Sequence, residues 1–375
     1  MIVFNKPYMT GKESFYISEA QKSGQLAGDG YFTKKCSHWI ESKIGANKAL
    51  ITHSCTAALE MAAILADIKP DDEIIMPSYT FVSSANAFVL RGGVPVFVDI
   101  KKDDLNIDEC LIEQAITSKT KAILVVHYAG VSCEMNKIMQ IAKKHNLLVI
   151  EDAAQGVLSK YKNKYLGSIG DLGCYSFHET KNIISGEGGA LLINNSKLMK
   201  RAEVIWQKGT NRQQFISGEI DKYSWMDIGS SFLPGELISS FLLAQLEKSE
   251  FITKKRLVLW NSYHKFFRQT KYADLADIPE KKNIKGHNGH IFFLIFRDKK
   301  TRDFFIKEMS ALKVQCVFHY APLHTSPFGI ANTKSNGSLV NTENLADRIV
   351  RLPLWLNLDL RTVTNAASKV FEMIK

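Results

Sequence analysis

The chain has 375 residues, of which 45% are hydrophobic, and a formal net charge of +10. This size and apolar content are enough to bury a large core, which excludes a disordered protein. The six cysteines form no C-x-x-C pair, which argues against a zinc site or a disulfide framework, so no metal is expected. The lysines occur in short dispersed pairs rather than in one basic block, which argues against nucleic-acid binding.

The N-terminal segment MIVFNKPYMTGKES has no cationic patch followed by an apolar run. No stretch of about eighteen apolar residues occurs in the sequence either. We therefore expect no signal peptide, no spanning helix and no membrane partner, and by default a cytoplasmic location.

Short apolar segments alternate with helical patterns along the first half of the chain. Helices are predicted over 55–68 and 134–146, where apolar residues recur with a period of 3.6. Strands are predicted at KALIT (48–52), DEIIMP (72–77), VPVFVDI (94–100), TKAILVVHY (120–128) and LLVIEDAA (147–154). This alternation predicts an α/β fold with a mostly parallel sheet and helices on both faces. GCYSF (173–177) and GALLIN (189–194) are expected to pair as a hairpin-type return.

The pattern changes after about residue 240. A long helix over 239–269 is expected to act as a hinge to a smaller α/β domain. In that domain we predict a strand at 290–296, a helix at 301–312, a strand at 314–321 and a surface loop at 337–344. The predicted domains are therefore 1–240, which holds the site, and 241–375, which holds the hinge helix and the small domain.

Ligands of open α/β sheets collect outside the carboxyl ends of the strands. Four residues near such ends match the needs of a pyridoxal phosphate site. Lys181, in SFHETKNIISGEGG (176–189), offers an amine, and Asp152 offers an acid for the pyridine nitrogen. Phe81 offers a flat ring, and Thr56 offers phosphate donors at a helix N-terminus.

Each of these residues also has an ordinary structural interpretation. An isolated lysine beside glycines is usually a solvated loop residue, and an aspartate at a strand end often caps a turn. Phe81 would more usually belong to the core, and Ser-Cys-Thr before an apolar helix is first of all an N-cap signal. It is the occurrence of all four at strand ends that favours a cofactor site.

Five segments carry a resemblance to a known family: SCTAALEMAA, PSYTFVSSANAFVLRGGVPVFVDI, EDAAQG, SFHETKN and GEGGALL. Together they resemble the sugar aminotransferases of the DegT/DnrJ/EryC1/StrS family, over nearly the whole chain. The resemblance implies a fold-type-I pyridoxal phosphate aminotransferase, with a mostly parallel seven-stranded sheet in the large domain and a smaller C-terminal α/β domain.

The resemblance also implies roles for individual residues. Lys181 would form the internal aldimine, Asp152 would pair with the pyridine nitrogen, and Gln155 would approach the ring oxygen of the cofactor. Phe81 would stack on the ring, and the phosphate would be received by Cys55, Thr56 and Ser176. The family site is completed across a homodimer interface by a G-x-N-x-R segment, which reads Gly229-Ser230-Ser231-Phe232-Leu233 here, so that Ser231 stands where asparagine is usual.

Other segments narrow the resemblance to a subgroup. They are GDGYFT, HYAGVSCEM, KGTNRQQF, KYSWMDIGSS and FHYAPLH, and they are most similar to TDP-4-amino-4,6-dideoxygalactose transaminases. The implied reaction moves an amino group from glutamate to C4 of TDP-4-keto-6-deoxyglucose, for lipopolysaccharide or O-antigen. Alternatives are the gluco product at C4, amination at C3, and a catalytically silent binding protein. Related sugar dehydratases have histidine at the aldimine position, so Lys181 favours transamination.

The resemblance also raises candidate contacts to the sugar nucleotide, although aromatic residues at such spacing more often serve packing. The candidates are Tyr31, Phe32, Thr33, Lys34, His178, Glu187, His319, Tyr320 and His324. For His178, a turn histidine hydrogen-bonded to the backbone is an equally plausible interpretation. The alternative for Glu187 is an ordinary turn carboxylate.

Overall fold

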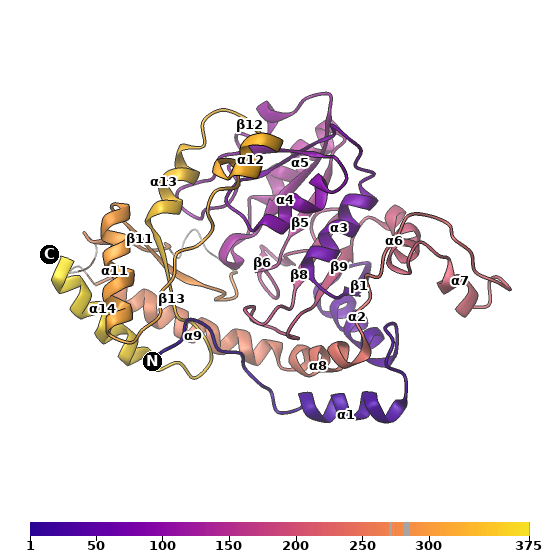
Figure 1. The fold of residues 1–375 in the computed structure, drawn as a ribbon, viewed down its shortest axis with the longest axis horizontal. Coiled ribbons are helices and arrows are strands. Elements are labelled where there is room, and N and C mark those ends of the chain that lie inside the picture. Colours follow the sequence, from indigo (N-terminus) through magenta and orange to yellow (C-terminus); the bar gives the residue numbers. More distant parts are fainter. Residues whose placement is uncertain (270–271, 273, 281–285, 375) are drawn as a thin grey trace.

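The computed structural model describes all residues except 270, 271, 273, 281–285 and 375. An eight-stranded sheet in the order β1-β9-β8-β5-β4-β2-β3-β12 forms the centre of the larger part (Figure 1). Its strands are β1 (Lys48–Thr52), β2 (Glu73–Pro77), β3 (Val94–Val98), β4 (Thr120–Val126), β5 (Leu148–Asp152), β8 (Leu172–Ser176), β9 (Gly189–Ile193) and β12 (Lys334–Ser335).

This sheet confirms the predicted α/β fold. Strand β9 runs antiparallel to its neighbours β1 and β8, which is the return expected of GCYSF and GALLIN. The other strand pairs of this sheet are parallel. Seven of the strands come from the first 240 residues, as expected, and the two-residue β12 from the C-terminal part adds an eighth by pairing with β3.

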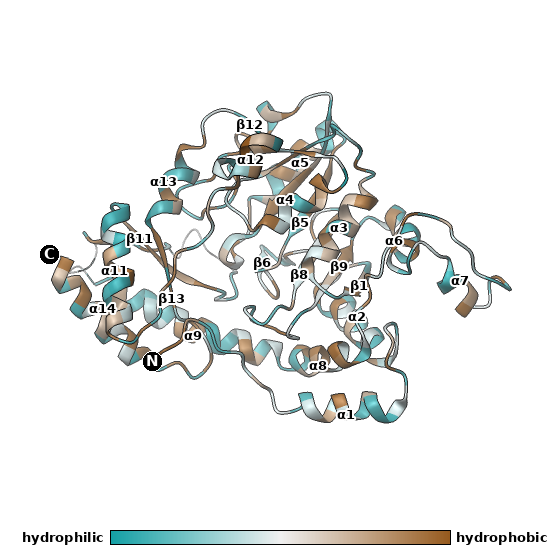
Figure 2. Ribbon diagram, in the orientation of Figure 1, coloured by the Kyte–Doolittle hydropathy of each residue, from teal (hydrophilic) through white to brown (hydrophobic). Residues whose placement is uncertain are grey.

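Helices cover both faces of the sheet, because its strands are almost continuously apolar. One face packs against α3, α4 and α6, and the other packs against α2, α5 and α8. Figure 2 shows polar residues at the outside of the molecule, for example on α11 (Lys299–Ala311) and α13 (Val340–Arg348) of the C-terminal part. The helices of this part are α1 (Glu13–Ser23), α2 (Tyr31–Ile44), α3 (Cys55–Leu65), α4 (Val82–Val89), α5 (Met135–His145), α6 (Met199–Trp206), α7 (Arg212–Ile216) and α8 (Glu236–Glu247), and a small hairpin joins β6 (Lys160–Tyr161) to β7 (Lys164–Tyr165).

The C-terminal part is built on a three-stranded sheet, in the order β10-β11-β13, and its core also takes in Tyr79 and Tyr128 of the larger part. Its elements are α9 (Ser249–Phe267), β10 (Ala276–Asp277), β11 (Phe292–Phe296), α11 (Lys299–Ala311), α12 (Pro327–Asn332), α13 (Val340–Arg348), β13 (Ile349–Leu352) and α14 (Leu360–Ile374). The first residues of the chain also lie here, since Ile2 bridges to Val314 and Trp355 Nε1 donates to the Val3 carbonyl at 3.1 Å.

Three sequence expectations for the second half were wrong. The long helix over 239–269 is two helices, α8 and α9, which meet at Lys248. The apolar pattern is continuous across this junction, but α8 packs with α2 on the large sheet whereas Trp260 and Tyr263 of α9 pack in the C-terminal core. The break between the helices therefore falls where the packing partner changes.

The segment 314–321 forms isolated bridges rather than a regular strand, because Val317 pairs with Arg351 while the following residues turn toward a cavity. The expected loop at 337–344 contains the start of α13. The N-cap residue of α13 makes no side-chain cap, but Asp99, just after β3, accepts hydrogen bonds from the backbone N–H groups of Asn341 and Thr342 at 2.9 and 2.8 Å. A cap supplied by a distant residue leaves no local signal.

Candidate active site

A cavity of about 890 Å³ lies between the carboxyl ends of the sheet strands and the C-terminal part. It is lined by these candidate cofactor residues: Cys55, Thr56, Phe81, Asp152, Gln155, Ser176 and Lys181. It is also lined by four of the candidate substrate residues: His178, Glu187, His319 and Tyr320. The structure thus brings together all four residues selected for their place at strand ends, with several that the family resemblance added.

Lys181 lies in the loop between β8 and β9, where its backbone N–H donates to the His178 carbonyl at 2.9 Å. The next residue, Asn182, fixes this loop by donating to the Asn288 carbonyl at 3.2 Å and by contacting Nδ1 of His290 at 2.9 Å. Burial lowers the pKa of Lys181, and the positive charge of Arg351 acts in the same direction. Asp152 and the Cys55 thiol oppose the shift without reversing it. The amine is therefore more available as a neutral nucleophile or base than an exposed lysine.

Asp152 ends β5 and is held in one orientation. Its Oδ2 accepts from the Ser84 hydroxyl at 2.6 Å, and its Oδ1 accepts from the Ala154 N–H at 3.1 Å. The Ser84 hydroxyl also contacts Thr80 Oγ1 at 2.7 Å. Ser84 was not among the sequence candidates, although it stands one helical turn after Thr80 on α4. A carboxylate oriented in this way suits a protonated ring nitrogen.

The N-terminus of α3 provides hydrogen-bond donors in the same cavity. Ser54 caps this helix by accepting from the Ala57 N–H at 3.0 Å, which leaves the earlier N–H groups of the first turn open to a ligand. The Thr56 hydroxyl contacts Ser83 Oγ at 2.8 Å, and Ser176 ends the neighbouring strand β8. Ser83 was also missed by the sequence argument. Hydroxyls beside a helix N-terminus are a suitable cradle for a phosphate.

Phe81 precedes α4 and is 57% exposed, which is unusual for a phenylalanine inside a fold. Its ring lies 6.4 Å from that of Tyr320, so the two rings border the same part of the cavity. Phe81 therefore offers the exposed flat surface that a cofactor ring requires.

Gln155 joins the two parts of the chain. Its Oε1 accepts from the Ala129 N–H at 2.7 Å, and its Nε2 donates to the Tyr320 hydroxyl at 2.8 Å.

His319 and Tyr320 enter the cavity from the C-terminal part, with stacked rings 3.7 Å apart. Nδ1 of His319 lies 2.7 Å from the Tyr128 hydroxyl. Burial, with Arg351 and Lys181 acting in the same direction, holds the pKa of His319 well below its usual range. Its imidazole is therefore neutral near pH 7.

His178 and Glu187 face each other at the mouth of the cavity, with Nε2 and Oε1 3.6 Å apart. The side chain of His178 is 39% exposed and that of Glu187 is 64% exposed. Nδ1 of His178 also contacts Thr180 within the same turn, at 2.9 Å. Nδ1 of His178 therefore takes part in the local turn, as the turn interpretation predicted, while Nε2 points to Glu187.

The remaining candidates do not line this cavity. Phe32 packs in the core, and the Thr33 hydroxyl bonds to Glu236, whose carboxylate also accepts from the N–H groups of Phe32 and Thr33 at 2.7 and 3.1 Å. Tyr31 and Lys34 are exposed on α2. Within one chain these residues lie outside the cavity, because hydrogen bonds to Glu236 hold the start of α2 against α8. Their expected contact with the sugar nucleotide stays a prediction.

His324 and Ser231 also lie away from the cavity. Nδ1 of His324 is 2.7 Å from Ser78 Oγ and its Nε2 is 3.0 Å from Glu343, so that it ties β2 to α13. Ser231 is exposed and bridges to Gln207, the residue that follows α6. The chain between these two residues carries α7, which projects from the body (Figure 1). Its assigned role in a partner chain stays a prediction.

The lining of the cavity fits pyridoxal phosphate. Lys181 offers an amine for its aldehyde, Asp152 an oriented carboxylate for its ring nitrogen, and the α3 N-terminus an anion site. Residues 7–371 match the model of the DegT/DnrJ/EryC1/StrS aminotransferase family. The chain belongs to this family.

Named relatives and solved structures agree with that assignment. GDP-perosamine synthase of Caulobacter vibrioides is 31% identical, over 86% of this chain and 85% of its own length. The Helicobacter pylori aminotransferase PseC, which is involved in the biosynthesis of pseudoaminic acid, has a TM-score of 0.91 at 25% identity, covering 99% of both chains. The fold is also that of the protein Spr1654 of Streptococcus pneumoniae in its PLP form, with a TM-score of 0.86, 24% identity, and coverage of 98% and 99%.

The protein is therefore an enzyme, a pyridoxal phosphate-dependent sugar aminotransferase. The cofactor expected from the strand-end residues and the enzyme class implied by the family resemblance are both confirmed. Among the described residues, no helix is long and apolar enough to cross a membrane.

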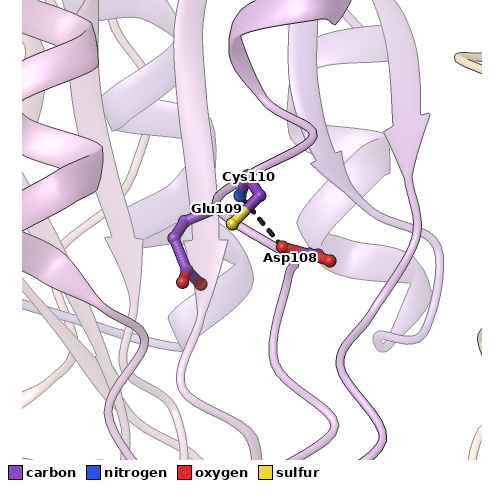
Figure 3. A group of neighbouring side chains, drawn as sticks. All are labelled: Asp108, Glu109 and Cys110. Carbon is purple, nitrogen blue, oxygen red and sulfur yellow. Dashed lines mark hydrogen bonds between the residues drawn. The ribbon is translucent and has the colours of Figure 1, made fainter.

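A separate acidic cluster lies outside the cavity of this aminotransferase (Figure 3). Asp108 accepts from the backbone N–H of Cys110 at 2.9 Å, which closes a local turn. Glu109 pairs with Lys101 at 3.2 Å, and the Cys110 thiol lies 3.0 Å from the Lys137 ammonium. Lysines already balance this cluster, so we assign it to the structure of the loop.

Proposed function

We propose that this aminotransferase moves an amino group from glutamate to C4 of TDP-4-keto-6-deoxyglucose. The product would be TDP-4-amino-4,6-dideoxygalactose, a precursor of bacterial surface polysaccharide such as O-antigen. The observation that carries the proposal is the convergence of Lys181 and the oriented Asp152 on one cavity that is large enough for a sugar nucleotide beside the cofactor. The choice of sugar rests on the segments that resemble this subgroup.

Each residue of the site has a proposed part in the reaction. The bound cofactor supplies an electron sink that stabilises a carbanion at the carbon next to the transferred nitrogen. Nζ of Lys181 takes the proton from the α-carbon of the donor and, in the second half-reaction, returns a proton to C4 of the sugar. Asp152 keeps the ring nitrogen protonated, Gln155 approaches the ring oxygen, and Phe81 stacks on the ring.

The phosphate of the cofactor would be held by Cys55 and Thr56 at the α3 N-terminus and by Ser176. For the sugar nucleotide, His178, Glu187, His319 and Tyr320 remain as candidates, because they line the cavity beside Lys181. We also keep the division into 1–240 and 241–375 as a proposal. The cavity lies between these two parts, so relative movement of the parts would open and close it.

A homodimer belongs to the same proposal. The projecting segment around α7 exposes large apolar side chains, including Trp225 (84%), Met226 (59%) and Tyr223 (45%). Apolar side chains gathered on a projection generally mark a contact surface. We infer that a second copy covers them and that Ser231 of this segment donates its hydroxyl to the cofactor phosphate of that copy.

The test is a product assay. Purified holoenzyme is incubated with glutamate and TDP-4-keto-6-deoxyglucose, and the product is examined by NMR. An axial amine at C4 supports the galacto product. An equatorial C4 amine or an amine at C3 would support aminotransfer but would show that the product is a different amino sugar. Parallel reactions with GDP-linked keto sugars test the alternative suggested by the GDP-perosamine synthase relative. Absence of an amine with every keto sugar contradicts the proposal.

A further inference from the structure

Arg351 is a cationic residue of the cavity that the sequence argument did not select. It lies in β13 of the C-terminal part and lines the same cavity as Lys181. Nε and Nη2 donate to the Phe318 carbonyl at 3.2 and 3.0 Å, and the guanidinium lies 4.9 Å from the centre of the Phe4 ring. These contacts fix the orientation of the guanidinium.

The contacts of Arg351 leave part of its hydrogen-bonding capacity unused. A guanidinium has five N–H donors, and the Phe318 carbonyl takes two of them. Asp152 and Glu187 line the same cavity, but within the described ranges neither forms an ion pair with Arg351. The cation is half-buried, and burial lowers its pKa. A desolvated cation without an acidic partner is costly to the fold, and an anionic ligand removes that cost.

The other arginine of the cavity has a different role. Arg256 of α9 is only 5% exposed, and it donates to the carbonyls of Gly289 and His290 at 3.1 and 2.6 Å. It therefore anchors the segment that carries His290, the partner of Asn182. Arg351 is the more open of these two arginines.

We propose that Arg351 binds a carboxylate of the amino-acid donor and so selects acidic donors for this aminotransferase. This inference rests on the proposed use of an amino acid as donor. The free Nη1 and Nη2 hydrogens form a fork that matches the two oxygens of a carboxylate. Arg351 and Lys181 line the same cavity, so one small ligand bound there can face both side chains.

A carboxylate fits this place better than the diphosphate of a nucleotide sugar. The amine and carboxylate of an amino acid are only two bonds apart through the α-carbon. In the sugar nucleotide, by contrast, the diphosphate is attached at C1, across the ring from the reacting C4. A cation in the cavity that holds Lys181 therefore suits the carboxylate of the amino acid, whereas the diphosphate must lie a sugar ring away from the reacting carbon.

The test measures binding of glutarate, a dicarboxylate without an amine, to the holoenzyme by calorimetry. Thymidine diphosphate is the comparison ligand. In Arg351→Gln we expect glutarate to bind about 10- to 100-fold more weakly, since one charge-assisted interaction is lost, with thymidine diphosphate changed less than about threefold. Arg351→Lys should give an intermediate loss, because an ammonium cannot form the fork.

The matched control is Arg348→Gln, which removes a half-buried arginine outside the cavity whose Nε donates to the Asn344 carbonyl on α13. It should leave both affinities unchanged. The proposal is overturned if wild-type enzyme binds no glutarate, if Arg351→Gln binds glutarate normally, or if both ligands weaken equally. Because no keto sugar is present, a wrong sugar product in the assay above would leave this result intact.

Discussion

The hydroxyl of Ser84 donates a hydrogen bond of 2.6 Å to Oδ2 of Asp152. This bond joins the first turn of α4 to the end of β5, so a helix that covers the sheet also orients the carboxylate of the active site. Ser84 is itself held by Thr80 at 2.7 Å. Asp152 thus has a supporting residue whose removal leaves the charge in place.

Ser84→Ala should lower kcat about tenfold, because a charge-assisted hydrogen bond is worth about 1.5–3 kcal/mol and Ala154 N–H still orients the other oxygen. Steady-state kinetics with saturating cofactor measure this effect. Ser42→Ala, on the exposed side of α2, is the control and should be unaffected. Unchanged kcat in Ser84→Ala would remove Ser84 from the supporting role.

Lys181→Ala should abolish turnover while the protein stays folded. Borohydride reduction followed by peptide mapping should place the cofactor on Lys181 in the wild type and leave the variant unlabelled. Lys164→Ala, in the exposed β6–β7 hairpin, should be labelled as the wild type is. Normal turnover by Lys181→Ala would end the assignment of the catalytic amine.

The pKa of Lys181 in the apoprotein should respond to its two charged neighbours in opposite directions. Arg351→Gln removes a positive charge and should raise the pKa, whereas Asp152→Asn removes a negative charge and should lower it. Carbon-13 NMR of reductively methylated lysines measures both shifts, with Lys181→Ala assigning the resonance. Shifts of the same sign in the two variants would contradict this electrostatic account.

Stability should fall on acidification because of His290. Burial, together with Lys181, Arg256 and other nearby cations, holds its pKa well below the usual value, so the folded state binds no proton there. The unfolded chain does bind one below about pH 6.5, and the unfolding free energy therefore drops as the pH falls, by up to about 1.4 kcal/mol per pH unit.

Urea denaturation at pH 7.5 and 5.5 tests this prediction. Between pH 7.5 and 5.5, the unfolding free energy of His290→Asn should fall by about 1 kcal/mol less than that of the wild type. The reason is that the unfolded variant has no imidazole at position 290 to take up a proton. His38→Asn, at an exposed site, should behave as the wild type does. Equal losses in wild type and His290→Asn would contradict the prediction.

Trp225→Ala should weaken the proposed homodimer. A central aromatic anchor contributes about 2 kcal/mol or more to an interface, so the dimer dissociation constant should rise about 30-fold. Sedimentation measures the change, and cofactor affinity should fall with it if Ser231 reaches the second copy. Phe328→Ala removes a side chain that is 55% exposed on α12 and should have no effect. A monomeric wild type would contradict the prediction.

Sequence patterns alone predicted the parallel sheet, the return of β9 and the strand-end residues Lys181, Asp152, Phe81 and Thr56. This was possible because apolar periodicity and β-α alternation are local properties, and the carboxyl ends of parallel strands meet at one edge. Family resemblance added Gln155, which lines the same cavity.

Only the tertiary structure decided which other residues join them. Arg351 is separated from Lys181 by most of the C-terminal part, and Ser84 from Asp152 by two strands, so no spacing in the sequence links these pairs. In the same way, Glu236 of α8 accepts a hydrogen bond from the start of α2, and Asp99, just after β3, caps α13. The physical reason is that periodicity records which face of an element is buried, whereas polar contacts between distant elements depend on how those elements finally pack.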